Sequence, residues 1–177
     1  MTDYGLLAKQ IVSLAEVDAH WLPVLSNAAA LLWDALDDIN WAGFYLVDPA
    51  TVLDAGAAPG VGVASSAHES SAPGLRLGPF QGKVACVRIP FGRGVCGTAA
   101  ATKTSQLVED VHQFPGHIAC DSASNSEVVV PIFKNSQVVG VLDIDSPSVA
   151  RFTREDLAGL EQVVKALESC ANFSDFC

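Results

Sequence analysis

The sequence predicts an α/β (α+β) domain in which helices flank a largely antiparallel sheet. The chain has 177 residues, of which 50% are apolar, and this is enough for the core of one domain. Apolar residues recur at helical spacing near both ends, and short apolar runs joined by polar turns lie between them. This order of elements is typical of one mixed domain, so we expect residues 1–177 to fold as a unit.

Charge and cysteine content limit the partners and the compartment. The formal net charge of -10 argues against nucleic acid and anionic membrane surfaces as partners, since both need a basic footprint. No run approaches the roughly 18–20 apolar residues of a membrane-spanning helix, and the N-terminus does not resemble a signal peptide. We expect a cytoplasmic protein, where the odd count of five cysteines argues against a structural disulfide framework and permits transient redox chemistry or metal binding.

Two helices are expected before the first strand. Apolar residues at helical spacing predict a helix over residues 4–15. A second helical run follows Pro23 and ends near Asp37.

The segment Trp41–Asp48 predicts a buried strand, because it is short and rich in aromatic and β-favouring residues. Its alternation would send Trp41 and Tyr45 to one face and Phe44 to the other. Residues 49–73 are rich in alanine, glycine, serine and proline and predict a flexible insert within the domain.

The middle of the chain predicts two short strands and a short helix. The strands are expected at 75–80 and 85–91, with a turn over 81–83. A glycine-rich loop over 92–97 then leads into an alanine-rich helix over 98–103.

The C-terminal part predicts a hairpin and a final helix. A short strand over 106–108 comes first, followed by an irregular segment. Two strongly apolar runs, 127–133 and 137–145, are joined by a polar turn over 134–136 and predict the hairpin. Thr153 is the expected N-cap of the last helix, because acidic residues and an amphipathic pattern follow it.

Gly92, Gly94 and Gly97 match the G-x-G-x-x-G pattern between a strand and a helix. A dinucleotide site would also need a parallel βαβ unit and an acidic residue about 20 positions later. The strands here are expected as hairpins, and Glu109 and Asp110 come too early, so we disfavour this interpretation. Backbone amides at the start of the helix can still bind a carboxylate or another anion.

Three cysteines, Cys86, Cys96 and Cys120, admit three interpretations. Free cysteines can pack as small hydrophobic residues in a core. The spacing His117-x-x-Cys120 is compatible with zinc, with Cys86 and Cys96 completing the ligands, but paired C-x-x-C motifs are absent. Redox thiols are the third interpretation, because Cys96 and Cys120 lie in glycine-containing or irregular segments where backbone amides can stabilise a thiolate.

Three acidic residues, Glu127, Asp143 and Asp145, lie at the expected start and end of the hairpin strands. Asp143 and Asp145 share one face of their strand, and the antiparallel partner brings Glu127 close to them. Bringing three carboxylates together costs free energy unless a cation pairs with them or one carboxyl stays protonated. Solvated strand ends are the alternative interpretation.

Four stretches resemble the free methionine-(R)-sulfoxide reductases, which are single GAF domains. They read NWAGFYLVD (40–48), LGPFQGKVACVRIPFGRGVCGTA (77–99), EDVHQFPGHIACDSASNSEVVVP (109–131) and GVLDIDS (140–146). The resemblance extends from Asn40 to the final helix, apart from the 49–73 insert. Its motifs are more specific than the general GAF pattern, because few other GAF domains carry all three cysteines in these contexts.

The resemblance implies a six-stranded antiparallel sheet with helices packed on it and a closed pocket for free methionine (R)-sulfoxide. By matching motif, Cys120 looks like the nucleophile and Cys86 like the resolving cysteine. Cys96 matches a third cysteine, which could itself attack sulfur or pass the disulfide onward. Trp41 and Tyr45 match residues that line the pocket around the methyl and thioether end of the substrate. The acids that would hold the substrate are Glu127, Asp143 and Asp145.

The implied reaction uses no bound cofactor or metal. A cysteine thiolate attacks the sulfoxide sulfur while a carboxylic acid protonates the departing oxygen. Methionine leaves, the nucleophile becomes a sulfenic acid, and the resolving cysteine forms a disulfide that thioredoxin reduces. The resemblance thus implies a role under oxidative stress with thioredoxin as partner, and it is compatible with a homodimer.

Two departures from the family pattern and two rival functions stay open. The family usually has a short turn where this chain has residues 49–73, so the insert either flanks the pocket or forms a surface loop. Cys170 and Cys177 lie outside the family's cysteine set, and we expect no role for them in the reaction. A non-catalytic ligand-sensing GAF module and a thiol redox sensor are the rival functions.

Overall fold

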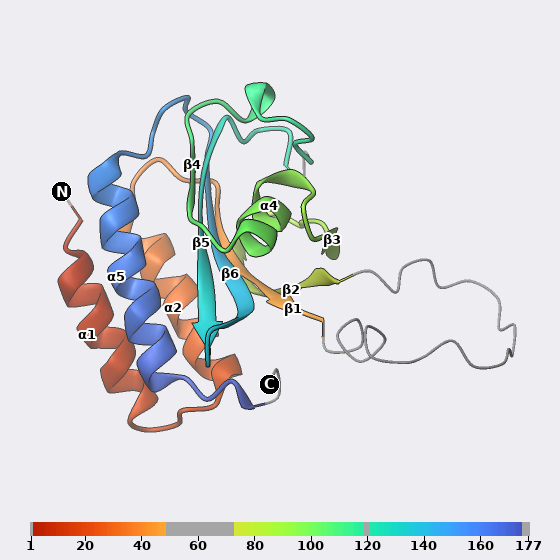
Figure 1. The fold of residues 1–177 in the computed structure, drawn as a ribbon. Helices are drawn as coiled ribbons and strands as arrows, with labels where there is room; N and C mark the ends of the chain where they lie inside the picture. Colours follow the sequence, from red (N-terminus) through yellow and green to blue (C-terminus); the bar gives the residue numbers. More distant parts are fainter. Residues whose placement is uncertain (1, 49–72, 119–120, 175–177) are drawn as a thin grey trace, which may run out of the picture.

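The computed structural model describes residues 2–48, 73–118 and 121–174. Within them, a six-stranded sheet with the order β3-β2-β1-β6-β5-β4 carries helices on both faces (Figure 1), and its strand pairs are all antiparallel. The elements are α1 (Tyr4–Ala15), α2 (Trp21–Ala35), β1 (Trp41–Val47), β2 (Gly74–Gly82), β3 (Arg88–Pro90), α4 (Gly94–Thr102), β4 (Gln106–Val108), η2 (Val111–Gln113), β5 (Ser126–Lys134), β6 (Gln137–Ser146) and α5 (Arg154–Cys170). The predicted fold class is therefore confirmed. Among the described residues, no helix is long and apolar enough to cross a membrane.

The sheet separates two apolar cores. Helices α1, α2 and α5 cover one face, and α4 lies on the other (Figure 1). Phe44 of β1 packs into the core under the three long helices, whereas Trp41 and Tyr45 pack into the core beneath α4 and β3. The alternation predicted for β1 is confirmed, because successive side chains of a strand point to opposite faces.

The second helix begins earlier than the sequence predicts. It starts at Trp21 rather than after Pro23, and His20 is its N-cap, with Nδ1 accepting a hydrogen bond from the backbone N–H of Leu22. Pro23 is compatible with this start because the first turn of a helix needs no intrahelical N–H donor. The first helix has the predicted bounds.

Helix α4 also begins earlier than predicted, at Gly94 rather than at residue 98. Cys96 therefore lies in the first turn of a helix and not in a glycine-rich loop. Gly97 allows this start, because a Cβ at this position would collide with the backbone oxygen of Pro90. The glycine motif thus serves close packing of α4 against the end of β3, and no parallel βαβ unit occurs in the described sheet.

The connection between β2 and β3 is longer than predicted. Strand β2 runs on to Gly82, where it pairs with Trp41 of β1, and β3 is limited to Arg88–Pro90. Residues 83–87 form an irregular loop in place of the predicted turn and strand start. Pairing with β1 explains the extension of β2, since the backbone groups of both strands are satisfied there.

The predicted hairpin forms between β5 and β6. Glu127 lies opposite Asp145, and Val129 lies opposite Asp143. The turn is shorter than predicted, because Lys134 already pairs with Gln137. A two-residue turn of this kind requires positive φ at both central residues, and Asn135 and Ser136 have φ values of 50° and 65°.

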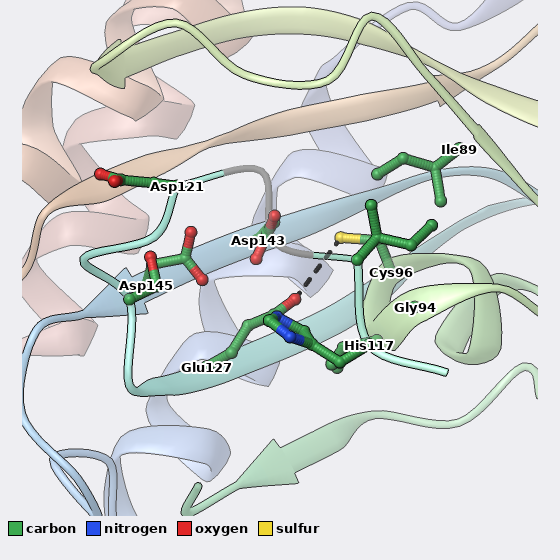
Figure 2. Close-up of a pocket in the computed structure, with 11 residues that line it drawn as sticks. Ile89, Gly94, Cys96, His117, Asp121, Glu127, Asp143 and Asp145 are labelled. Atoms are coloured by element: carbon green, nitrogen blue, oxygen red, sulfur yellow. Dashed lines mark hydrogen bonds between the residues drawn. The ribbon is translucent and has the colours of Figure 1, made fainter. Parts of the chain in front are cut away.

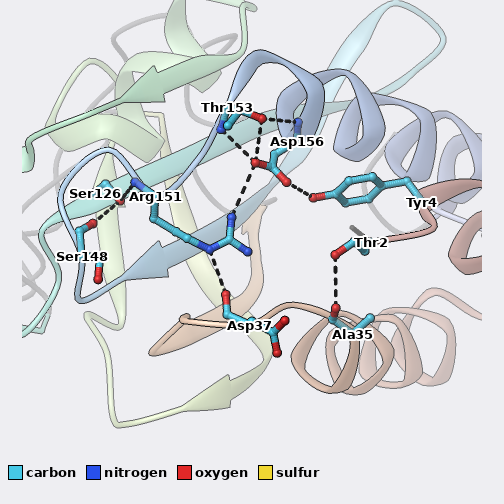
Figure 3. Close-up of polar contacts among 9 residues, drawn as sticks. All are labelled: Thr2, Tyr4, Ala35, Asp37, Ser126, Ser148, Arg151, Thr153 and Asp156. Carbon is cyan, nitrogen blue, oxygen red and sulfur yellow. Dashed lines mark hydrogen bonds and ion pairs between the residues drawn. The ribbon is translucent and has the colours of Figure 1, made fainter.

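A polar network joins the N-terminal helix to the start of α5 (Figure 3). Thr153 is the N-cap of α5, as predicted, and the structure shows that it forms a capping box with Asp156. Asp156 also accepts a hydrogen bond from the Tyr4 hydroxyl at 2.5 Å, and it lies 3.5 Å from Nη1 of Arg151. Arg151 Nε donates to the backbone oxygen of Asp37 at 2.9 Å, so one residue links α5 to the segment before β1.

Candidate active site

Strands β5 and β6 place three carboxyl groups on the face of the sheet that α4 covers. Glu127 and Asp145 are direct cross-strand partners, and Asp143 lies two residues before Asp145 on the same face. Strand β1 runs beside β6, with Trp41 opposite Asp145. The proximity that the hairpin predicted is therefore present, and Glu127 and Asp143 are each only 6% exposed.

Cys96 joins this cluster from the first turn of α4. Its thiol donates a hydrogen bond of 3.8 Å to Oε1 of Glu127. Ligand atoms of Cys96, Glu127 and Asp143 all lie within 4.8 Å of one another, and all three residues are buried. The early start of α4 is what brings the thiol to the acids.

These groups face a small cavity of about 30 Å³ (Figure 2). It is lined by Ile89, Gly94, Val95, Cys96, His117, Ile118, Asp121, Ser124, Glu127, Asp143 and Asp145. All three predicted acids and one predicted cysteine are in this set. Trp41, Tyr45 and Cys86 are not among the described residues that line the cavity, and they belong to the apolar core beside it.

Burial dominates the electrostatics of the cluster. It raises the pKa of Glu127 well above its ordinary value, and Asp143 and Asp145 add to the effect. Burial also raises the pKa of Asp145, with Asp143 as the next cause, and it raises the pKa of Asp143 to about 6. The thiol pKa of Cys96 rises well above its ordinary value for the same reason and because two carboxylates lie nearby. The cluster therefore retains protons near neutral pH.

The cluster is not balanced by a cation from the described part of the chain. The ion pairs there involve Asp48, Asp121 and Asp156 instead. One oxygen of Asp143, Oδ1, is buried without a hydrogen-bond partner. Buried acceptors of this kind are costly, so the arrangement suits a ligand that brings hydrogen-bond donors and positive charge.

A metal ion is a second kind of group that the cluster could hold. The thiol of Cys96 and the two nearest carboxylates are ligands that zinc accepts. The zinc set suggested by the sequence differs, because it combined Cys86 and Cys96 with His117 and Cys120. Cys86 is disulfide-bonded and has no thiolate to offer, so that set is wrong in this respect.

Trp41 and Tyr45 form a stacked aromatic group next to the acids. Their ring centroids are 5.7 Å apart at an interplanar angle of 22°, and Phe80 stacks on the Trp41 ring at 5.3 Å. Nε1 of Trp41 donates to the backbone oxygen of Lys83 at 3.2 Å, and the Tyr45 hydroxyl donates to the backbone oxygen of Cys86 at 3.1 Å. The aromatic group therefore fixes the backbone of the 83–87 loop.

The predicted cysteines occupy different environments. Cys86 is partly buried in the 83–87 loop and is disulfide-bonded, whereas Cys96 and Cys170 carry free thiols. The partner of Cys86 lies outside the described residues. The predicted nucleophile, Cys120, and residues 49–72 of the predicted insert over 49–73 also lie outside them.

Sequence reasoning missed a polar group at the mouth of the cavity. Nδ2 of Asn40 donates to Oδ2 of Asp121 at 3.1 Å and to Oγ of Ser124 at 3.0 Å. Lys83 Nζ lies 3.7 Å from the same carboxylate of Asp121. These residues gave no periodic signal, because polar residues in irregular segments look like any solvated loop.

Comparisons with known proteins agree on the family. The GAF domain family model matches residues 9–170. The chain is 47% identical over 173 residues to the free methionine-R-sulfoxide reductase of Escherichia coli, covering 98% of this chain and 91% of that one. The fRMsr of Staphylococcus aureus in complex with substrate has a TM-score of 0.79 at 47% identity, covering 97% of both chains. The free methionine-R-sulfoxide reductase of Neisseria meningitidis in complex with its substrate has a TM-score of 0.78 at 42% identity, covering 94% of this chain and 86% of that one. The chain therefore belongs to the free methionine-(R)-sulfoxide reductases of the GAF-domain family.

Proposed function

We propose that the protein reduces free L-methionine (R)-sulfoxide to L-methionine with electrons from thioredoxin in the cytoplasm. The observation that carries this proposal is the buried carboxyl cluster of Glu127, Asp143 and Asp145, which no cation of the described chain balances. Two relatives with substrate complexes, matched over 97% and 86% of their own chains, support the choice of ligand.

The cluster serves two tasks in this proposal. A free amino acid carries an ammonium group, and its charge and N–H donors suit ionised carboxylates and the orphaned Oδ1 of Asp143. A peptide-bound methionine lacks that charge, which favours the free amino acid. Glu127, whose pKa burial raises well above its ordinary value, holds the proton that the sulfoxide oxygen needs as its bond to sulfur breaks.

The aromatic group supplies the apolar end of the site. Trp41 and Tyr45 do not line the cavity, but their stacked rings lie in the core beside it, and such rings suit the methyl and thioether groups of methionine. The Tyr45 hydroxyl already donates its hydrogen bond to the backbone oxygen of Cys86, so the tyrosine contributes its ring face rather than its oxygen.

Cys120 is the nucleophile in this proposal, and Cys86 is its resolving partner. Its thiolate attacks the sulfoxide sulfur, the oxygen is protonated, and the resulting hydroxyl passes to Sγ of Cys120 as the S–O bond of the substrate breaks. Methionine leaves, and Cys120 is then a sulfenic acid. The Cys86 thiol then condenses with it, releasing water and forming a disulfide. Cys96 is less suited to the first attack, because burial and two neighbouring carboxylates raise its thiol pKa and disfavour the thiolate.

The test is an epimer-resolved assay with the purified protein, a dithiol or thioredoxin, and the two epimers of free methionine sulfoxide. The proposal predicts consumption of the R epimer with formation of methionine and persistence of the S epimer. Equal slow loss of both epimers, or no loss of either, would contradict the proposed function. A ligand-sensing module would bind without turnover, and a thiol redox sensor would oxidise Cys86 without releasing methionine.

A further inference from the structure

Charge is distributed unevenly along this acidic chain. Between Gly74 and Val108 the sequence contains five basic residues and no acidic residue. All 20 acidic residues and the other five basic residues lie outside this segment. The segment includes β2, β3 and the loop that carries Cys86, so the disulfide-bonded cysteine lies in the most basic part of the chain.

Two large apolar side chains flank Cys86 at the surface. Val84 is 87% exposed and Val87 is 68% exposed, although most valines of this protein are buried. The backbone of the loop is nevertheless fixed, since the carbonyl oxygens of Lys83, Cys86 and Val87 accept hydrogen bonds from Trp41, Tyr45 and Leu77 respectively. Fixed exposed valines around a reactive sulfur are typical of a surface that another protein covers.

Positive charge surrounds these valines. Arg76 and Arg88 are cross-strand partners, and both contact the single carboxylate of Asp48, at 2.9 Å and 2.8 Å, so one positive charge remains in excess. Lys83 is 71% exposed, and its Nζ lies 3.7 Å from Oδ2 of Asp121. Arg93 is the N-cap residue of α4, in the segment after β3, and takes part in none of the ion pairs between described residues.

We propose that Val84, Val87, Lys83 and Arg93 form the docking surface for a dithiol reductase of the thioredoxin type that carries acidic residues beside its reactive thiols. This inference rests on the proposed function, which requires a reducible disulfide at Cys86. Charge complementarity speeds the encounter of such partners, and the apolar contact slows their separation. Among the described strands, β3 lies at the edge of the sheet, next to the loop that carries the two valines.

The surface directs a defined exchange of electrons. One thiolate of the reductase attacks Sγ of Cys86, the bond between Cys86 and Cys120 breaks, and Cys120 leaves as a thiolate. The second thiol of the reductase then attacks the mixed disulfide and releases Cys86. The dithiol loses two electrons and becomes a disulfide, and its two protons pass to the two released thiolates.

The experiment isolates this half-reaction. The full-length protein is oxidised to the Cys86 disulfide, then mixed with reduced thioredoxin or, in parallel, with dithiothreitol, and the appearance of protein thiols is followed. We expect Val84→Ser and Arg93→Glu each to lower the second-order rate constant for thioredoxin by about fivefold or more, with no change for dithiothreitol. Arg93→Glu should also flatten the dependence of the thioredoxin rate on salt.

Matched controls change the same residue types elsewhere. Val17→Ser removes an equally exposed valine at the end of α1, and Lys165→Glu reverses an exposed charge on α5. The proposal is overturned if thioredoxin reduces the docking variants as fast as the parent, if dithiothreitol slows equally, or if the controls lose as much. No methionine sulfoxide is present, so this result is independent of whether the protein turns over that substrate.

Discussion

The Tyr45 hydroxyl donates a hydrogen bond to the backbone oxygen of Cys86 across 3.1 Å, which links the stacked aromatic group to the predicted resolving cysteine. Burial and three nearby carboxyl groups, together with the Cys96 thiol, raise the pKa of Tyr45, so the phenol stays protonated and keeps its donor at working pH. In the proposed reaction, this one side chain would contact the substrate and also hold the Cys86 loop in position.

Tyr45→Phe should separate the two thiol steps. The phenyl ring keeps the wall, so methionine release in a single turnover should stay close to the parent rate. Loss of one hydrogen bond worth about 1 kcal/mol should slow disulfide formation by about fivefold. Rapid quenching with quantification of methionine, and trapping of the sulfenic acid, would follow the two steps. Equal slowing of both steps would show that the hydroxyl has no particular role in the Cys86 loop.

Substitution of the three cysteines should give three different patterns. Cys120→Ser should abolish single-turnover methionine release, whereas Cys86→Ser should release about one equivalent and then stop, because the sulfenic acid is not resolved. Cys96→Ser should still perform the first turnover. If Cys96→Ser alone stops the first release of methionine, the nucleophile is Cys96 and our assignment is wrong. Cys170→Ser is the matched control and should leave every step unchanged.

Glu127→Gln should remove the proposed proton donor while keeping the side-chain shape. We expect kcat to fall about 100-fold or more, the range of general acid catalysis. For the parent enzyme, activity should fall as pH rises and the donor ionises, and the variant should lose that limb of the pH profile. Glu161→Gln, which alters a carboxylate that accepts a hydrogen bond from Ser105 far from the cluster, serves as control. An unchanged pH profile in Glu127→Gln would assign the proton to another group.

Asp143→Asn should change how stability depends on pH. Burial raises the folded-state pKa of Asp143 from 3.8 to about 6, so folding favours the protonated form. That contribution to stability is complete below the unfolded pKa and is lost as pH rises through about 6. The variant lacks this titration, so its free energy of unfolding relative to the parent should rise by about 2 kcal/mol between pH 4.5 and 7.5. Urea unfolding at several pH values measures it, and Asp110→Asn, at an exposed site whose pKa lies below this range, should show a flat difference.

Tyr4→Phe should affect stability without affecting chemistry. The variant leaves Asp156 without one of its donors at the junction of α1 and α5 (Figure 3). We expect a loss of about 1–2 kcal/mol in the free energy of unfolding. Single-turnover kinetics should match the parent, which also makes Tyr4→Phe a control for Tyr45→Phe. A change in the rate of methionine release would mean that the network reaches the active site.

Local patterns in the sequence determined much of the fold and part of the site. The alternation in β1 placed Trp41 and Tyr45 on one face, and the β5–β6 hairpin brought Glu127 to Asp145. Both predictions succeeded because strand periodicity and hairpin register depend on neighbouring residues alone. The capping box of Thr153 and Asp156 is equally local, and it marked the start of α5.

Tertiary structure decided what depends on contacts between distant segments. The start of α4 at Gly94 follows from the close approach of Gly97 to Pro90, and this start carries Cys96 to Glu127, 31 residues further along the chain. The hydrogen bond from Asn40 to Asp121 joins residues 81 positions apart. Periodicity carries no information on such pairs, because the free energy that favours them comes from packing and burial in the folded chain. The motifs of the sequence pointed to a family and its thiols, while the folded chain set the raised pKa values of the acids and the fixed position of the Cys86 loop.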